Sequence, residues 1–239
     1  MSISINIKSQ RSYKGYTFIT GFHGIGVTGY ITTRHIVETL GASYIGYVES
    51  ELNPSFVGMD EERLVFPFEF YEYKDIILLM CRFQPHRLEQ KAFSKVIAEW
   101  VVNSGFKQAV LVGGLDNRFQ QEDDNIVRCI HTKRYSLKSD ELGVQTLEKG
   151  LFVTGPLALM LMYFEINNFP GIALLPYAEQ GRPDPRAASN AIKVINKICG
   201  LEINTEQLLS DAETIEKELR EVIEQQEVRD TEGNKGMYV

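Results

Sequence analysis

The sequence predicts an α/β fold of three layers, in which a mostly parallel sheet lies between two layers of helices. The main observation is that strand-like runs of β-branched and aromatic residues alternate with segments whose apolar residues recur at helical spacing. The second is size, because 239 residues, 44% of them hydrophobic, can build one large core with an appendage. We therefore expect an α/β core domain over residues 1–200, a helical segment over 201–226 and a flexible tail over 227–239.

The first half of the core is expected to hold several strands and two helices. Residues 64–73 alternate phenylalanines with other side chains, and Pro67 has no amide hydrogen to donate, so this strand should be antiparallel or lie at a sheet edge. Gly41 closes the first helix, since glycine readily adopts the left-handed conformation that ends helices. The other strands of this half are expected at residues 1–7, 16–20, 44–49 and 75–81, and the helices at 27–40 and 87–102.

The second half continues the alternation. Gly113 and Gly114 end a strand, and a polar loop follows over residues 116–125. Pro156 lies in the first turn of a buried helix, where its missing amide hydrogen breaks no helical bond. Strands are expected at residues 108–112, 126–131 and 172–175, and helices at 154–164 and 187–199.

The segment from residue 205 to 226 is rich in Glu, Lys, Gln and Leu and carries one apolar stripe. Spacings of four and three within the stripe are typical of a helix that packs along one side. Two interpretations stay open: the helix packs on its own domain, or it joins subunits of an oligomer. The tail that follows has few apolar residues and two glycines, which predicts disorder. The stripe consists of Leu208, Ala212, Ile215, Leu219 and Val222.

Charge and cysteine content limit the possible partners and the compartment. The net charge is −7 and the Lys and Arg residues are dispersed, so no nucleic acid is expected as a partner. Three cysteines without CxxC spacing indicate reduced thiols. The longest apolar stretch, residues 155–164, is far shorter than a membrane span, and the first residues do not resemble a signal peptide. We expect a cytoplasmic protein that does not contact membranes.

One motif is typical of an enzyme. Gly24, Gly26 and Gly29 match GxGxxG between a strand and a helix, and Glu49 ends the next strand at about the interval of a ribose-binding acid. In a nucleotide-binding α/β enzyme, such glycines let backbone amides approach a pyrophosphate. The alternative is that a tight turn requires them for its own packing. Three residues, Gly21 to His23, lengthen the turn beyond the usual fingerprint, so the cofactor-free alternative is preferred.

Other catalytic patterns are missing from the sequence. It contains neither GxxxxGK[ST] nor GxSxG, and its four histidines lack the spacing of metal ligands. We therefore expect a protein that is not an enzyme and has no catalytic residues, no metal site and no cofactor.

Several segments resemble the proteasome assembly chaperone 2 (PAC2) family. They are residues 21–29, Gly155-Pro156-Leu157, residues 169–175 and residues 183–188. The resemblance implies a three-layer α/β fold, no catalysis, and a role as a chaperone or docking factor for the 20S proteasome core. It also implies an oligomer, and a homo-oligomer would be similar to the archaeal branch of the family.

The last three residues, Met237, Tyr238 and Val239, are similar to the hydrophobic-Tyr-any (HbYX) tripeptide that proteasome activators place between neighbouring α subunits of the core. A free terminal carboxylate would pair with a cation in such a pocket, the Tyr238 ring would fill an aromatic-sized slot, and Met237 would add apolar contact. Two alternatives stay open. The tail is a frayed end without a role, or the protein is an assembly scaffold that binds α subunits through its folded surface.

Overall fold

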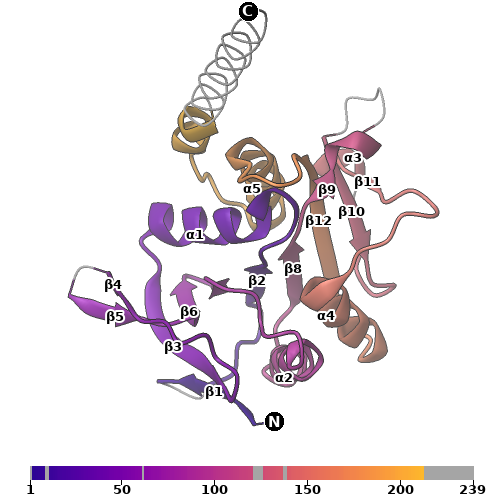
Figure 1. Ribbon diagram of the computed structural model, residues 1–239. Coiled ribbons are helices and arrows are strands. Elements are labelled where there is room, and N and C mark those ends of the chain that lie inside the picture. The colour runs from indigo at the N-terminus through magenta and orange to yellow at the C-terminus, as the bar shows by residue number, and fades with distance from the viewer. Residues whose placement is uncertain (1, 9–10, 61, 121–125, 137–138, 213–239) are drawn as a thin grey trace, which may run out of the picture.

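A long sheet lies between two pairs of helices (Figure 1). The computed structural model describes residues 2–8, 11–60, 62–120, 126–136 and 139–212. Within them, the strands of the main sheet follow the order β1-β3-β6-β7-β2-β8-β12-β10-β11, and β9 pairs with the end of β12. The expected three-layer α/β fold is confirmed.

The four central strands of the sheet are parallel, and most strands on either side of them are antiparallel. Every residue of β7 is buried, as expected for a strand that is covered on both faces. The central strands are β7 (Ile76–Cys81), β2 (Thr17–Gly21), β8 (Gln108–Val112) and β12 (Gly171–Ala178). The others are β1 (Ile3–Ile7), β3 (Ser43–Ser50), β6 (Phe68–Tyr73), β9 (Leu115–Asp116), β10 (Val127–His131) and β11 (Gln145–Thr146).

Helices α1 (Thr28–Leu40) and α5 (Pro185–Cys199) cover one face of the sheet, and α2 (Gln90–Asn103) and α4 (Gly155–Ile166) cover the other (Figure 1). Alternate residues of each strand therefore enter different cores. On β2, Ile19 packs in the cluster under α1 and α5, whereas Phe18 packs in the cluster under α2 and α4. A short helix, α3 (Ser139–Leu142), lies outside these two pairs.

The expected helices of the core are all present, with ends that differ by up to three residues. α5 begins two residues before the expected start because Asp184 caps it. The Asp184 side chain accepts a hydrogen bond from the Ala187 amide at 2.9 Å, and Pro185 occupies the first turn.

The expected strand at 64–73 is divided into two. Residues Arg63–Val65 form β5, which pairs with β4 (Gly58–Asp60) in a hairpin that the sequence did not suggest, and β6 starts after Pro67. β6 is antiparallel as predicted, but it is an interior strand between β3 and β7.

The beginning of the C-terminal segment packs on the core. Residues 206–212 are helical, Leu208 joins the core cluster under α1 and α5, and Ala212 is buried. The remainder of the expected helix, residues 213–226, and the expected tail, residues 227–239, lie outside the described residues.

Candidate functional site

The glycine-rich loop joins β2 to α1 through a single 3₁₀ turn, Ile25–Val27. Gly26 has a φ of 64°, and a Cβ there would lie 2.8 Å from the Cβ of Ala178 and 3.0 Å from that of Asp184. Its carbonyl accepts a hydrogen bond from the Asp184 amide at 2.8 Å. Gly26 is therefore required for contact between this loop and the start of α5.

Gly29 has a similar packing role at the start of α1. A Cβ there would lie 2.4 Å from the carbonyl oxygen of Val112 and 2.5 Å from the Phe22 amide nitrogen. A Cβ on Gly21 would lie 2.3 Å from the Gly29 carbonyl oxygen. These glycines let the first turn of α1 touch the backbone of the sheet, which explains them without a bound phosphate.

Glu49 lies away from the glycine-rich loop. It is exposed on β3, opposite Ser4 of β1, and strands β6 and β7 separate β3 from β2. The structure thus does not bring Glu49 together with Gly24, Gly26 and Gly29 as a ribose-binding acid requires.

A cavity of about 530 Å³ opens at the carboxyl ends of the central strands. Its wall includes the loops after β2, β7 and β8 and the chain that leads into α4. Gly24 belongs to this wall, and a Cβ on it would meet no described atom within 4 Å. Gly24 is thus the one glycine of the GxGxxG pattern that faces open space.

Burial shifts the pKa values of His23 and of the three cysteines. Burial lowers the pKa of His23. Burial raises the pKa of Cys81 to about 12, of Cys129 to about 11 and of Cys199 to about 12. At neutral pH these thiols stay protonated and therefore unreactive. Among the described residues no group of three or more His, Cys, Asp and Glu side chains could hold a metal ion.

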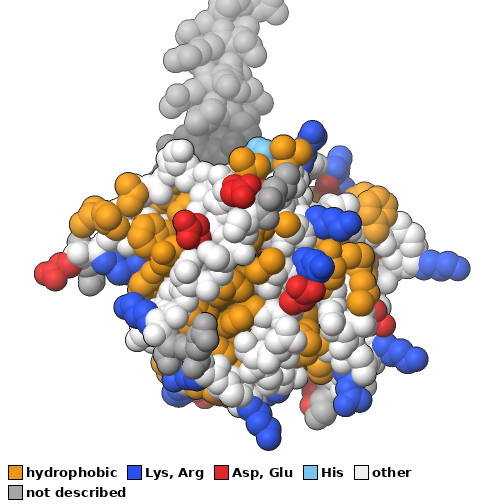
Figure 2. Space-filling model, turned by 90° about the horizontal axis from the view of Figure 1, so that it is seen from below, with side chains coloured by type: hydrophobic (Ala, Val, Ile, Leu, Met, Phe, Trp, Pro, Cys, Tyr) orange, Lys and Arg blue, Asp and Glu red, His pale blue; other side chains and the backbone are white. Residues whose placement is uncertain are grey.

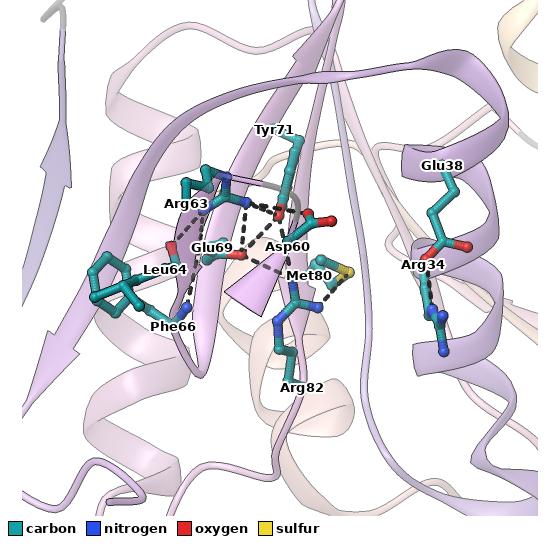
Figure 3. Close-up of polar contacts among 10 residues, drawn as sticks. All are labelled: Arg34, Glu38, Asp60, Arg63, Leu64, Phe66, Glu69, Tyr71, Met80 and Arg82. Carbon is teal, nitrogen blue, oxygen red and sulfur yellow. Dashed lines mark hydrogen bonds and ion pairs between the residues drawn. The ribbon is translucent and has the colours of Figure 1, made fainter. Parts of the chain in front are cut away.

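A buried acid attaches the β4–β5 hairpin to the sheet (Figure 3). Glu69 of β6 is fully buried. Its carboxylate forms ion pairs with Arg63 Nη1 of β5 at 2.7 Å and with Arg82 Nη2 at 3.1 Å. The hydroxyl of Tyr71 donates to Glu69 Oε2 at 2.7 Å, and the Phe66 amide donates to Oε1 at 3.1 Å. Sequence reasoning missed this cluster because its two arginines are six and thirteen residues from the acid.

The hairpin and the loop before it expose a group of apolar side chains, here called the hairpin patch. Figure 2 shows hydrophobic side chains gathered on this projecting end of the molecule. Such a concentration of exposed apolar side chains is typical of a protein interface. The patch consists of Leu52, Phe56, Val57, Met59 and Leu64.

The expected docking residues, Met237, Tyr238 and Val239, lie outside the described residues. Within the described part of the chain, no helix is both long and apolar enough to cross a membrane.

Comparison with known proteins identifies the family. The model of the PAC2 family matches residues 18–223. The chain belongs to the PAC2 family.

Similar proteins come from archaea and from a vertebrate. The crystal structure of PbaA of Pyrococcus furiosus, an archaeal homologue of proteasome-assembly chaperone, superposes with a TM-score of 0.83 at 27% identity and covers 100% of both chains. PbaB of the same organism, an archaeal proteasome activator, gives a TM-score of 0.75 at 20% identity, over 92% of this chain and 98% of PbaB. Proteasome assembly chaperone 2 of Danio rerio is 23% identical over 180 residues, which are 68% of this chain and 63% of that protein.

Proposed function

We propose that this protein is a proteasome assembly chaperone or proteasome-binding factor without catalytic activity. In this proposal it docks on the α-subunit ring of the 20S core particle through Met237, Tyr238 and Val239. The observation that carries the proposal is the similarity to PbaA, which extends over the whole length of both chains. Proteins of this shape include both a homologue of an assembly chaperone and an activator of the proteasome.

The geometry of the glycine-rich loop supports a docking protein over a nucleotide-binding enzyme. Gly26 and Gly29 contact protein backbone and side chains, and two strands, β6 and β7, lie between Glu49 on β3 and the loop after β2. The sheet and its helices thus act as a scaffold in the proposal, and the tail carries the recognition.

Docking would be multivalent, because a single tripeptide binds weakly. A homo-oligomer presents several tails, and the second tail binds at a raised local concentration once the first is in place. The hairpin patch supplies an apolar surface that self-association would bury. The spacer at residues 227–236 spans at most about 35 Å when extended and averages about 16–19 Å as a flexible coil. That slack would tolerate a symmetry mismatch between an oligomer and a seven-fold ring.

The test is a pull-down of mature 20S cores and of free α subunits with variants of the tail. Deletion of Met237 to Val239 and Tyr238→Ala should each abolish association with mature cores, while fold and oligomer mass stay unchanged. The matched control is Lys235→Ala in the spacer, which should bind as the unaltered protein does. A glycine added after Val239 should also abolish binding, because the proposal requires a free carboxylate on that residue.

Two results would change the proposal. Unchanged affinity of the truncated protein for mature cores would refute docking by the tail. Binding of the truncated protein to free α subunits alone would favour the scaffold alternative, in which the folded surface is the docking site.

A further inference from the structure

The cavity at the carboxyl edge of the sheet has the place and size of a small-molecule site. Its volume of about 530 Å³ is in the range of ligand pockets. Strands β7, β2, β8 and β12 run parallel, and the cavity is lined by the loops after β7, β2 and β8 together with Leu175 of β12. In α/β sheets, ligands bind in crevices outside the carboxyl ends of such strands. The described residues that line the cavity do not include Met237, Tyr238 or Val239.

The walls of the cavity are mainly apolar. Phe22 and Val112 are buried and form its floor, together with Leu175 of β12. Phe119 and Phe152 also line it but are largely exposed, with 51% and 79% of their surface accessible, so they stand at the mouth. Two exposed rings beside an apolar floor suit an aromatic or branched aliphatic group.

The polar groups of the wall are few. α4 begins at the cavity with Gly155, Pro156 and Leu157, and the Thr154 side chain makes no capping hydrogen bond among the described residues. Pro156 has no amide hydrogen, so the first turn offers the amides of Gly155 and Leu157, which have no partner within the helix, and the helix dipole makes this end positive.

A second observation also indicates a polar ligand group. His23 Nε2 belongs to a wall residue, is shielded from solvent and has no hydrogen-bond partner in the described structure. Buried polar atoms of this kind are rare in folded proteins and call for a partner.

Asp116 is the acidic residue of the cavity wall, and it is already paired. Its two carboxylate oxygens accept hydrogen bonds from Arg118 at 2.6–3.0 Å. This bidentate pair neutralises the charge of Asp116. No unpaired carboxylate in the described wall would therefore repel an anion at the start of α4.

We propose that this cavity binds a small molecule with an aromatic or branched aliphatic body and one carboxylate group. The carboxylate lies at the first turn of α4, and the body packs on Phe22, Val112 and Leu175. The position of Gly24 allows a direct test, because its φ of −137° is open to other residues and a Cβ there would enter free space. A leucine at this position starts from a Cβ in free space, so its side chain should occupy part of the cavity.

The experiment titrates 3-phenylpropionate into the full-length protein and follows binding by calorimetry and by ¹⁵N chemical shifts. Saturable binding is expected, with shifts centred on the start of α4. Gly24→Leu should weaken binding at least about tenfold, equal to 1.4 kcal/mol. Asn103→Leu is the matched control. Asn103 is exposed at the end of α2 opposite to Gln90, which lines the cavity, so this variant should bind with unchanged affinity. The uncharged probe 3-phenylpropanamide should bind about fivefold more weakly than the acid.

Several outcomes would overturn the proposal. One is the absence of saturable binding of 3-phenylpropionate up to about 10 mM. The others are equal affinity for 3-phenylpropionate and 3-phenylpropanamide, and an unaltered affinity of Gly24→Leu for 3-phenylpropionate. If Gly24→Leu melts well below the unaltered protein, Phe152→Ala replaces it, because that exposed ring can be removed without cost to the core. Phe152→Ala should weaken binding about threefold to tenfold, and no change would count against the site. Proteasome association through the tail is a separate property, and Gly24→Leu should leave it intact.

Discussion

Two ion pairs of the same length lie in opposite surroundings, and both are drawn in Figure 3. Arg63 Nη1 to Glu69 Oε1 and Arg34 Nε to Glu38 Oε1 each measure 2.7 Å. The side chain of Glu69 is completely buried, whereas that of Glu38 on α1 is 58% exposed. Removing one member of a buried pair leaves a charge that water cannot reach, whereas an exposed pair is replaced by solvent and salt. Burial, and not distance, should therefore decide what each pair contributes to stability.

The largest effect is expected for Glu69→Ala. This change leaves Arg63 and Arg82 without their common acceptor, and their side chains are only 31% and 15% exposed. The free energy of unfolding should fall by about 3 kcal/mol, at the lower end for a broken buried pair because both arginines keep some solvent. Urea denaturation measures this value. Glu69→Gln retains an acceptor oxygen, so its free energy of unfolding should fall by less than that of Glu69→Ala. A fall below about 1 kcal/mol in Glu69→Ala would contradict the idea that burial makes this ion pair important for stability.

A smaller and more local effect is expected for Arg63→Met. Arg82 still neutralises Glu69 in this variant, but the hairpin loses its ion pair and the guanidinium that lies 4.3 Å from the centre of the Tyr44 ring. We expect a loss of about 1–2 kcal/mol and faster amide hydrogen exchange across residues 58–65, with α1 unchanged. Arg34→Met is the matched control. Equal exchange in the two variants would show that Arg63 does not hold the hairpin.

The sequence predicted the parts of this fold that depend on periodicity. The central strands are continuous apolar runs, and the helices carry apolar residues on one side, so both were located to within a few residues. The hairpin was missed because Gly58–Asp60 and Arg63–Val65 have too few residues to alternate. Glu69 alternates with Phe68 and Phe70 along β6 and so lies on the opposite face, but both faces of β6 are covered at that point, and partners distant in sequence neutralise the acid.

The candidate sites were less predictable than the fold. The GxGxxG pattern marks a real strand-to-helix turn, but only the structure shows that Gly26 and Gly29 contact protein atoms while Gly24 faces the cavity. The cavity combines loops that are more than a hundred residues apart, such as those of Phe22 and Val153, and no local sequence pattern predicts that such distant loops lie together. The docking residues 237–239 remain a prediction from the sequence.

A third effect is expected for Tyr71→Phe, which removes the hydroxyl group and its hydrogen bonds from the buried cluster. The Tyr71 hydroxyl donates to Glu69 and accepts from Arg63 Nη2 at 2.6 Å, so the loss should be about 1 kcal/mol near neutral pH. Burial and the nearby carboxylate raise the pKa of Tyr71. An unfolded tyrosine loses its proton above about pH 10 while Tyr71 keeps it, so this residue should make stability fall as pH rises beyond that value. Denaturation at several pH values should show a shallower alkaline decline in the variant, and an unchanged slope would refute this role.

The smallest effect is expected for Glu38→Gln on the exposed pair. Arg34 and Glu38 are one helical turn apart, and their side chains are 55% and 58% exposed. The free energy of unfolding of the variant should be lower than that of the unaltered protein by less than about 0.5 kcal/mol. This difference should vanish in about 1 M salt because the ions screen exposed charges. The same salt series applied to Glu69→Ala should leave most of its loss in place, since the buried acid is not reached by mobile ions. If both losses vanished in salt, the Glu69 cluster would be as open to solvent as the surface of α1, and burial could not explain the attachment of the hairpin.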